Sequence, residues 1–125
     1  EEPIKVFNNG NLSRDFTYID DIVEGLIKVI DRHPMEPEYR IYNIGCSHPV
    51  KLMEFIEILE KAIGKPAKKV FLPMQPGDVY QTYADTSKLE RDFGYKPTTS
   101  LTQGISQFIA WYLSPNNPLH SLPSV

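Results

Sequence analysis

The strongest constraint on the fold is a run of apolar residues at helical spacing between positions 52 and 63. The positions that share one helix face there are Leu52, Phe55, Ile56, Leu59 and Ile63. Gly64 and Pro66 follow, an order typical of a helix end. Similar patterns predict helices over residues 20–33, 86–93 and 101–112. Asp85 caps the helix predicted over 86–93 and Gly94 ends it, and Ser100 caps the helix predicted over 101–112.

The helix predicted over residues 20–33 begins at an acidic pair. We interpret Asp20 as its N-cap and Asp21 as a charge suited to the positive end of the helix dipole. Its apolar residues recur at helical spacing and predict a single apolar face, made of Ile22, Val23, Leu26, Ile27 and Ile30.

Short β-like runs separate these helices, at residues 4–7, 16–19, 40–44 and 69–72. Helices and strands therefore alternate roughly, which favours an α/β or mixed α+β domain with few short strands and about four helices. So few short strands make a weak sheet by themselves, so we expect a piece of a larger protein. We expect the domain to span residues 1–113. Residues 114–125 hold three prolines and no periodicity and are predicted to be a loose tail.

Composition excludes several classes of protein. With 125 residues, 41% of them hydrophobic, the chain is long enough for one globular domain. A net charge of −3 argues against DNA or RNA binding, which needs many cations. No apolar run approaches the ~20 residues that span a bilayer. Cys46 is the single cysteine, so we expect no disulfide and, as the simplest compartment, the cytoplasm.

The usual signatures of catalysis and metal binding are missing from the sequence. There is no glycine-rich phosphate loop, no nucleophile elbow and no histidine spacing suited to a metal, so we expect no catalytic, cofactor-binding or metal-binding residue. Two polar clusters remain, around Arg14 and over residues 75–78. Arg14 could meet a phosphate bidentately, or could simply pair with Asp15 or Asp20 at the surface.

A family resemblance favours the first alternative. The run Arg14-Asp15-Phe16-Thr17-Tyr18-Ile19-Asp20-Asp21 resembles extended short-chain dehydrogenase/reductases that act on nucleotide sugars, most closely UDP-glucuronate 4-epimerases. Four later segments continue in the family's order: Tyr42-Asn43-Ile44-Gly45, Gln75-Pro76-Gly77-Asp78-Val79, Ala84-Asp85 and Gly94-Tyr95-Lys96-Pro97. The resemblance covers roughly residues 3–113.

The resemblance implies a role for each of five residues. Arg14 would contact the phosphates of a UDP-sugar, and the backbone at Val6 and Phe7 would meet the uracil edge. Asp78 would accept hydrogen bonds from the ribose hydroxyls. Gln75 stands where many relatives have a second phosphate-binding arginine, so it implies a weaker contact or another cation.

The resemblance also implies that the reacting groups lie elsewhere. The family's glycine motif for NAD and its Tyr-x-x-x-Lys pair belong to an amino-terminal Rossmann domain that this sequence does not contain, and relatives are commonly homodimers. We therefore expect this chain to bind substrate as part of an epimerase but to be inactive alone, without bound cofactor. The alternatives are a UDP-glucuronate decarboxylase or a nucleotide-sugar dehydratase, disfavoured by Asp15 and Phe16, or a non-catalytic module that binds a nucleotide or a protein.

Overall fold

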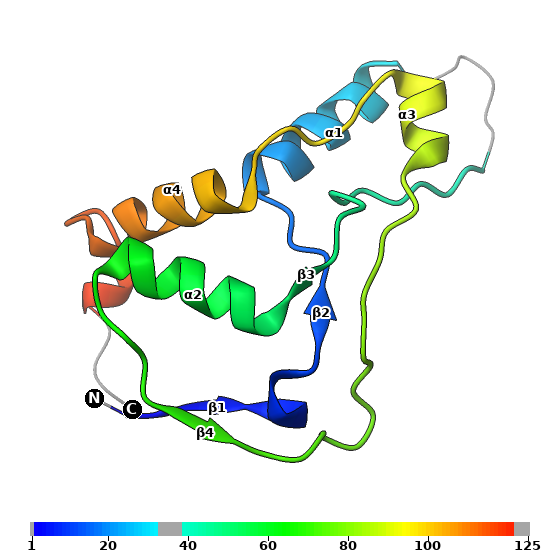
Figure 1. Cartoon of the computed structure of the whole chain (residues 1–125). Helices are drawn as coiled ribbons and strands as arrows, with labels where there is room; N and C mark the ends of the chain where they lie inside the picture. Colours follow the sequence, from blue (N-terminus) through cyan, green and yellow to red (C-terminus); the bar gives the residue numbers. More distant parts are fainter. Residues whose placement is uncertain (1, 33–38, 122–125) are drawn as a thin grey trace.

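Four α-helices carry most of the regular structure in the computed structural model, which describes residues 2–32 and 39–121 (Figure 1). They are α1 (Ile19–Asp31), α2 (Leu52–Ile63), α3 (Ser87–Phe93) and α4 (Leu101–Leu113). Gly64 and Gly94 end α2 and α3 in the left-handed conformation, with φ of 76° and 63°, which confirms the two predicted helix ends. No helix in the described ranges has the length and hydrophobicity that a membrane crossing requires.

Four short strands form two separate pairs. β1 (Ile4–Val6) lies parallel to β4 (Lys69–Phe71), and β2 (Ser13–Arg14) lies antiparallel to β3 (Val50–Lys51). Two short 3₁₀ helices, Phe7–Gly10 and Pro118–Ser121, complete the elements of residues 2–32 and 39–121. The mixed α/β class with few short strands and four helices is therefore confirmed.

Two predicted strands are not found. Residues 16–18 lead into α1 without strand pairing, and residues 40–44 have no strand partner among the described residues. Both runs have the residue types of strands, but a strand forms only where another one offers its backbone hydrogen-bonding groups. Neither run has such a neighbour in the described part of the chain.

The core lies in two regions. In the first, α1 and α3 lie close together (Figure 1), and Leu89, Phe93 and Tyr95 form a buried cluster. Partly buried Tyr42 and Ile44 pack against this cluster, so the run predicted as a strand contributes side chains to the core instead. In the second, α2 packs along α4.

Helix α1 packs through a polar and glycine-containing side. Tyr18 is the N-cap residue and provides no side-chain cap, so the interpretation of Asp20 as N-cap is wrong. Asp21 is only 4% exposed, and its carboxylate accepts the backbone N–H groups of Thr98 and Thr99 at 3.3 and 3.2 Å. It thus holds the segment before α4 and also stands in the first turn of α1, where the sequence predicts a favourable charge.

The predicted apolar side of α1 points away from the described core. Four of its residues, Val23, Leu26, Ile27 and Ile30, are between 46% and 70% exposed. Gly25, on the opposite side, lies so near the ring of Tyr95 that an added Cβ would stand 2.7 Å from a ring carbon. The helix approaches the core through Gly25. Its opposite side stays exposed as a continuous apolar strip, which we call the α1 apolar strip (Val23, Leu26, Ile27, Ile30).

The segment after α4 is fastened at its beginning. Asn117 is 3% exposed, and its side-chain amide donates to the carbonyl of Tyr112 at 2.7 Å. The sequence predicts a loose tail here, but a buried, hydrogen-bonded side chain fixes residue 117 to α4. Residues 122–125 of the predicted tail lie outside the described part.

Candidate functional site

Strand β2 and the segment over residues 78–82 bring the two polar clusters of the sequence together. Ser13 donates its N–H to the carbonyl of Tyr80 at 2.9 Å, and its carbonyl accepts the N–H of Thr82 at 3.2 Å. A parallel bridge joins Ser13 to Gln81. The segment therefore runs beside β2 as a third, irregular strand, which places Asp78 next to Arg14.

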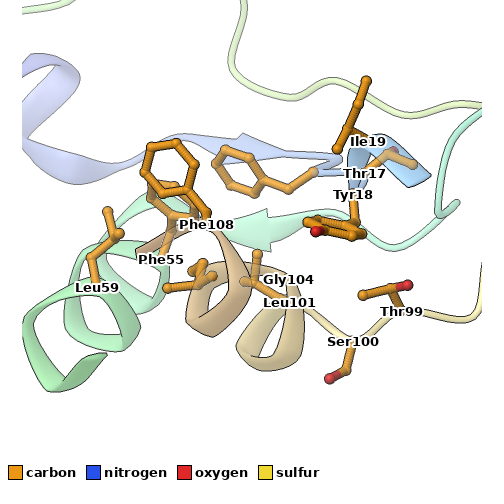
Figure 2. Close-up of a pocket in the computed structure, with 12 residues that line it drawn as sticks. Thr17, Tyr18, Ile19, Phe55, Leu59, Thr99, Ser100, Leu101, Gly104 and Phe108 are labelled. Carbon is orange, nitrogen blue, oxygen red and sulfur yellow. The ribbon is translucent and has the colours of Figure 1, made fainter. Parts of the chain in front are cut away.

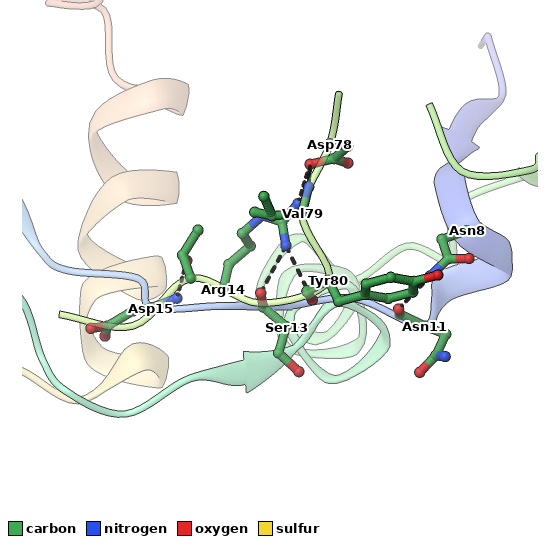
Figure 3. A network of polar contacts seen from close by, with 9 residues as sticks. Asn8, Asn11, Ser13, Arg14, Asp15, Asp78, Val79 and Tyr80 are labelled. Carbon is green, nitrogen blue, oxygen red and sulfur yellow. Dashed lines mark hydrogen bonds and ion pairs between the residues drawn. The ribbon is translucent and has the colours of Figure 1, made fainter. Parts of the chain in front are cut away.

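Arg14 and Asp78 form an ion pair across 64 positions of sequence. Nη2 of Arg14 donates to Oδ1 of Asp78 at 2.6 Å (Figure 3). The two side chains are 24% and 27% exposed. The alternative in which Arg14 pairs with Asp15 or Asp20 is therefore wrong, because its carboxylate partner in the structure is Asp78.

The turn before Asp78 has the geometry that its composition predicts. The carbonyl of Gln75 accepts the N–H of Asp78 at 3.2 Å, and Gly77 has a φ of 83°. Proline at the second position and glycine with positive φ at the third are typical of a type II turn. Gln75 itself is exposed, and its side chain carries no charge.

Val6 and Phe7 lie at the end of β1 with different accessibility. Val6 is 1% exposed, and its carbonyl accepts the N–H of Leu72 from the strand pair with β4. Phe7 begins the 3₁₀ helix and is half-buried. Of the two residues, Phe7 is therefore the more accessible.

Asp15 is a structural centre that the sequence did not reveal. Its Oδ2 accepts the N–H groups of Ser47 and Ala84, each at 3.0 Å, and its Oδ1 accepts that of His48 at 3.3 Å. Its own N–H donates to Thr82 Oγ1 at 3.0 Å. One carboxylate thus joins three segments directly beside Arg14. A polar hollow of about 400 Å³ opens next to it, lined by Asp15, Thr17, residues 42–45 and residues 82–84.

Tyr80 is a second residue missed by the sequence reasoning. The residue is 65% exposed, and its ring extends from the backbone beside Arg14 toward Asn8 and Asn11 (Figure 3). An exposed aromatic face next to a cation can stack on a planar base. No local pattern announces it, since exposure depends on the fold.

The remaining candidate chemistry is weak. Burial raises the pKa of the Cys46 thiol, which makes it a poorer nucleophile. Within residues 2–32 and 39–121, no group of three histidine, cysteine, aspartate or glutamate side chains is placed to hold a metal ion.

An apolar hollow of about 340 Å³ lies elsewhere, between the segment before α1 and helices α2 and α4 (Figure 2). Phe16 stacks on Phe55 there, with ring centroids 4.0 Å apart, and Tyr18 lies against Gly104. None of the five predicted site residues lines this hollow. Its apolar walls suit neither a diphosphate nor a ribose, so the polar cluster at Arg14 is the better candidate site.

Comparison with known proteins points to one family. Residues 1–108 match the family model described as GDP-mannose 4,6 dehydratase. An uncharacterized protein of Methanocaldococcus jannaschii is 52% identical over 110 residues, which are 88% of this chain and 33% of that protein. A probable UDP-glucuronate 4-epimerase of Rhizobium meliloti is 41% identical over 126 residues, which cover 88% of this chain and 37% of that protein.

The fold is also found in a solved enzyme. The crystal structure of UDP-glucuronic acid 4-epimerase from Bacillus cereus, in complex with UDP-glucuronic acid and NAD, matches with a TM-score of 0.76 and 38% identity. The match covers 83% of this chain and 33% of that one. The chain therefore spans about a third of the length of the proteins it matches.

Proposed function

This chain belongs to the family of the GDP-mannose 4,6 dehydratase model and corresponds to the carboxy-terminal part of an extended short-chain dehydrogenase/reductase, and from that membership we propose that it binds the UDP-sugar substrate of an epimerase. The full-length protein would be an NAD-dependent UDP-glucuronate 4-epimerase. Residues 1–113 would form the binding domain. The observation that carries the proposal is the contact between Arg14 and Asp78.

The proposed roles follow the chemistry of each group. The guanidinium of Arg14 would bind the diphosphate, because its planar donors match phosphate oxygens. Asp78 would accept a ribose hydroxyl through Oδ2, which accepts no hydrogen bond from the described residues. The backbone at Val6 and Phe7 would face the uracil. Gln75 would supply at most neutral hydrogen bonds, so Arg14 would be the one cation among these five residues.

The chemistry of the reaction would come from the rest of the protein. NAD accepts and returns a hydride when it is bound, and this sequence has neither a glycine motif to hold its pyrophosphate nor a Tyr-x-x-x-Lys pair. This chain would orient the nucleotide so that the sugar reaches that cofactor.

The α1 apolar strip supports the proposal that an amino-terminal Rossmann domain packs on this chain. Four exposed apolar residues in a row on one helix are typical of a surface that a partner covers. Tyr39 and Ile41, 90% and 66% exposed, precede the core-packed residues of the same unpaired run. The relatives have about twice as much additional chain as this one contains, which is enough for such a domain.

An activity assay on the full-length protein tests the function. We expect UDP-glucuronate to be converted to its 4-epimer in the presence of NAD, as followed by chromatography of the nucleotide sugars. Loss of carbon dioxide to give a UDP-pentose would identify a decarboxylase instead. Binding of UDP without any turnover would identify a non-catalytic module.

A binding measurement on the isolated chain tests the need for the second domain. If both parts close the site, the chain alone should bind UDP only weakly. A micromolar dissociation constant from calorimetry on the 125-residue chain would show that its own residues make a sufficient pocket.

A further inference from the structure

The guanidinium of Arg14 is held from two sides by other groups of the protein. Its Nη1 donates to the carbonyl of Ser13 at 2.8 Å and to that of Tyr80 at 3.4 Å, and its Nη2 donates to Asp78 at 2.6 Å (Figure 3). The two carbonyls belong to adjacent backbone segments, so they fix one edge of the group. Asp78 fixes its direction.

These contacts leave two N–H donors of the Arg14 guanidinium for a ligand. A guanidinium has five N–H donors, and the three hydrogen bonds to Ser13, Tyr80 and Asp78 use three of them. The N–H of Nε and one N–H of Nη2 have no acceptor among the described residues. Two donors are the number that a bidentate contact with a phosphate uses.

Asp78 is itself rigidly placed. Its Oδ1 accepts the N–H of Val79 at 2.8 Å in addition to Arg14, and its N–H closes the turn that begins at Gln75. Gly77, with its positive φ, lets that turn form without strain. The carboxylate is therefore an anchor for Arg14, held in place by the turn.

We propose that Asp78 is a positioning residue for phosphate recognition: it fixes Arg14 so that the two remaining guanidinium donors meet the diphosphate together. This inference rests on the proposed function and adds to the ribose contact, which concerns Oδ2. The pair persists in the bound state, with Oδ1 of Asp78 on Arg14 and the diphosphate on the free donors. A long side chain that is already ordered loses less conformational freedom on binding than a mobile one.

The two roles of Asp78 can be separated by ligands with and without phosphate. Calorimetry on the full-length protein would measure UDP and uridine binding to wild type, Asp78→Ala, Arg14→Ala and the double variant. We expect Asp78→Ala to weaken UDP binding about tenfold more than uridine binding, because only UDP uses Arg14. In the Arg14→Ala background, Asp78→Ala should weaken both ligands by the same factor.

Two further variants guard against trivial explanations. Asp78→Asn keeps the shape and one acceptor oxygen but removes the charge. It should therefore weaken UDP binding more than uridine binding, but by a smaller margin than Asp78→Ala does. It also stands in for Asp78→Ala if that variant does not fold. Arg91→Ala removes an arginine whose side chain is 69% exposed and paired with its neighbour Asp92, and should leave both affinities unchanged.

Each remaining outcome decides against the inference. Equal losses for UDP and uridine in the Arg14-containing protein would mean that Asp78 contacts only the nucleoside, which overturns positioning and leaves the proposed function standing. A gain in UDP affinity on Asp78→Ala would mean that the carboxylate competes with phosphate. A wild-type protein that binds no UDP would overturn the proposed function and this inference together.

Discussion

Asp15 offers the sharpest test of how the candidate site is built. Its carboxylate accepts the backbone N–H groups of Ser47, Ala84 and His48, and replacing it with alanine leaves three donors without their acceptor. A hydrogen bond to a charged group contributes about 1.5–3 kcal/mol when buried. Because Asp15 is half-buried and His48 is exposed, we take the lower end for two bonds and little for the third, a total of about 2–4 kcal/mol.

Urea unfolding followed by circular dichroism measures this loss. For a domain of this size, the expected destabilisation lowers the midpoint by about 1–2 M. Asp15→Asn keeps one acceptor oxygen and should recover part of the loss. Asp15→Ser, which places a short hydroxyl there, should behave like the alanine variant, because its oxygen cannot reach the N–H groups of two separate segments.

Asp20 provides the matched control. It lies five positions away, is exposed and stands in the first turn of α1, so Asp20→Ala removes only a favourable helix-dipole contact of about 0.3–1 kcal/mol. If the two alanine variants unfold at the same urea concentration, the carboxylate of Asp15 does not join the segments, and the reasoning is refuted.

Three other outcomes are expected. Gly25→Ala should destabilise the chain by about 2–3 kcal/mol in thermal unfolding, since the new Cβ would stand 2.7 Å from the Tyr95 ring. Gly64→Ala should cost only about 1 kcal/mol, since only its φ of 76° opposes the change, and equal effects would count against close packing at Gly25. Burial raises the pKa of Tyr95 to about 12 from its usual value of 10, so the stabilisation that comes from keeping this phenol neutral is complete below pH 10 and is lost as the pH rises to 12. Tyr95→Phe should remove this part of the decline in urea midpoint between pH 9 and 12, and an unchanged slope would show that Tyr95 does not cause it. Arg14→Ala in the full-length protein should weaken UDP-sugar binding by about 1.5–3 kcal/mol in calorimetry, and unchanged affinity would remove Arg14 from the site.

The helices could be predicted because their signals are local. Apolar spacing, a capping serine at position 100 and glycines at 64 and 94 all act within a few residues of the element they define. Ser100 accepts the N–H of Gln103 at 3.2 Å, as the sequence pattern predicts. The strand prediction was wrong where pairing decides the outcome. Residues 40–44 have strand-forming side chains, but a strand needs a paired neighbour, and no local pattern shows whether one is present.

The buried side of α1 and the neighbours of the site residues were harder to predict for the same reason. The spacing in α1 predicts an apolar strip but not whether the rest of the chain covers it, and the helix packs instead through Gly25 and Asp21. The closeness of Arg14 and Asp78 followed from a family resemblance, since nothing in either motif points to the other. The structural roles of Asp15 and Tyr80 could not be predicted, because a carboxylate or an aromatic ring acquires its neighbours only on folding.

The long sequence separation of the contacts that hold the first residues also has a kinetic consequence. β1 pairs with β4, Asp15 binds the N–H of a residue 69 positions later, and Asp21 binds those of residues 77 and 78 positions later. Contacts of such high sequence separation slow folding, because a large loop must close before they form. During synthesis, the opening residues therefore emerge well before their partners, and Arg14 can meet its carboxylate only after the 64 positions up to Asp78 have been added.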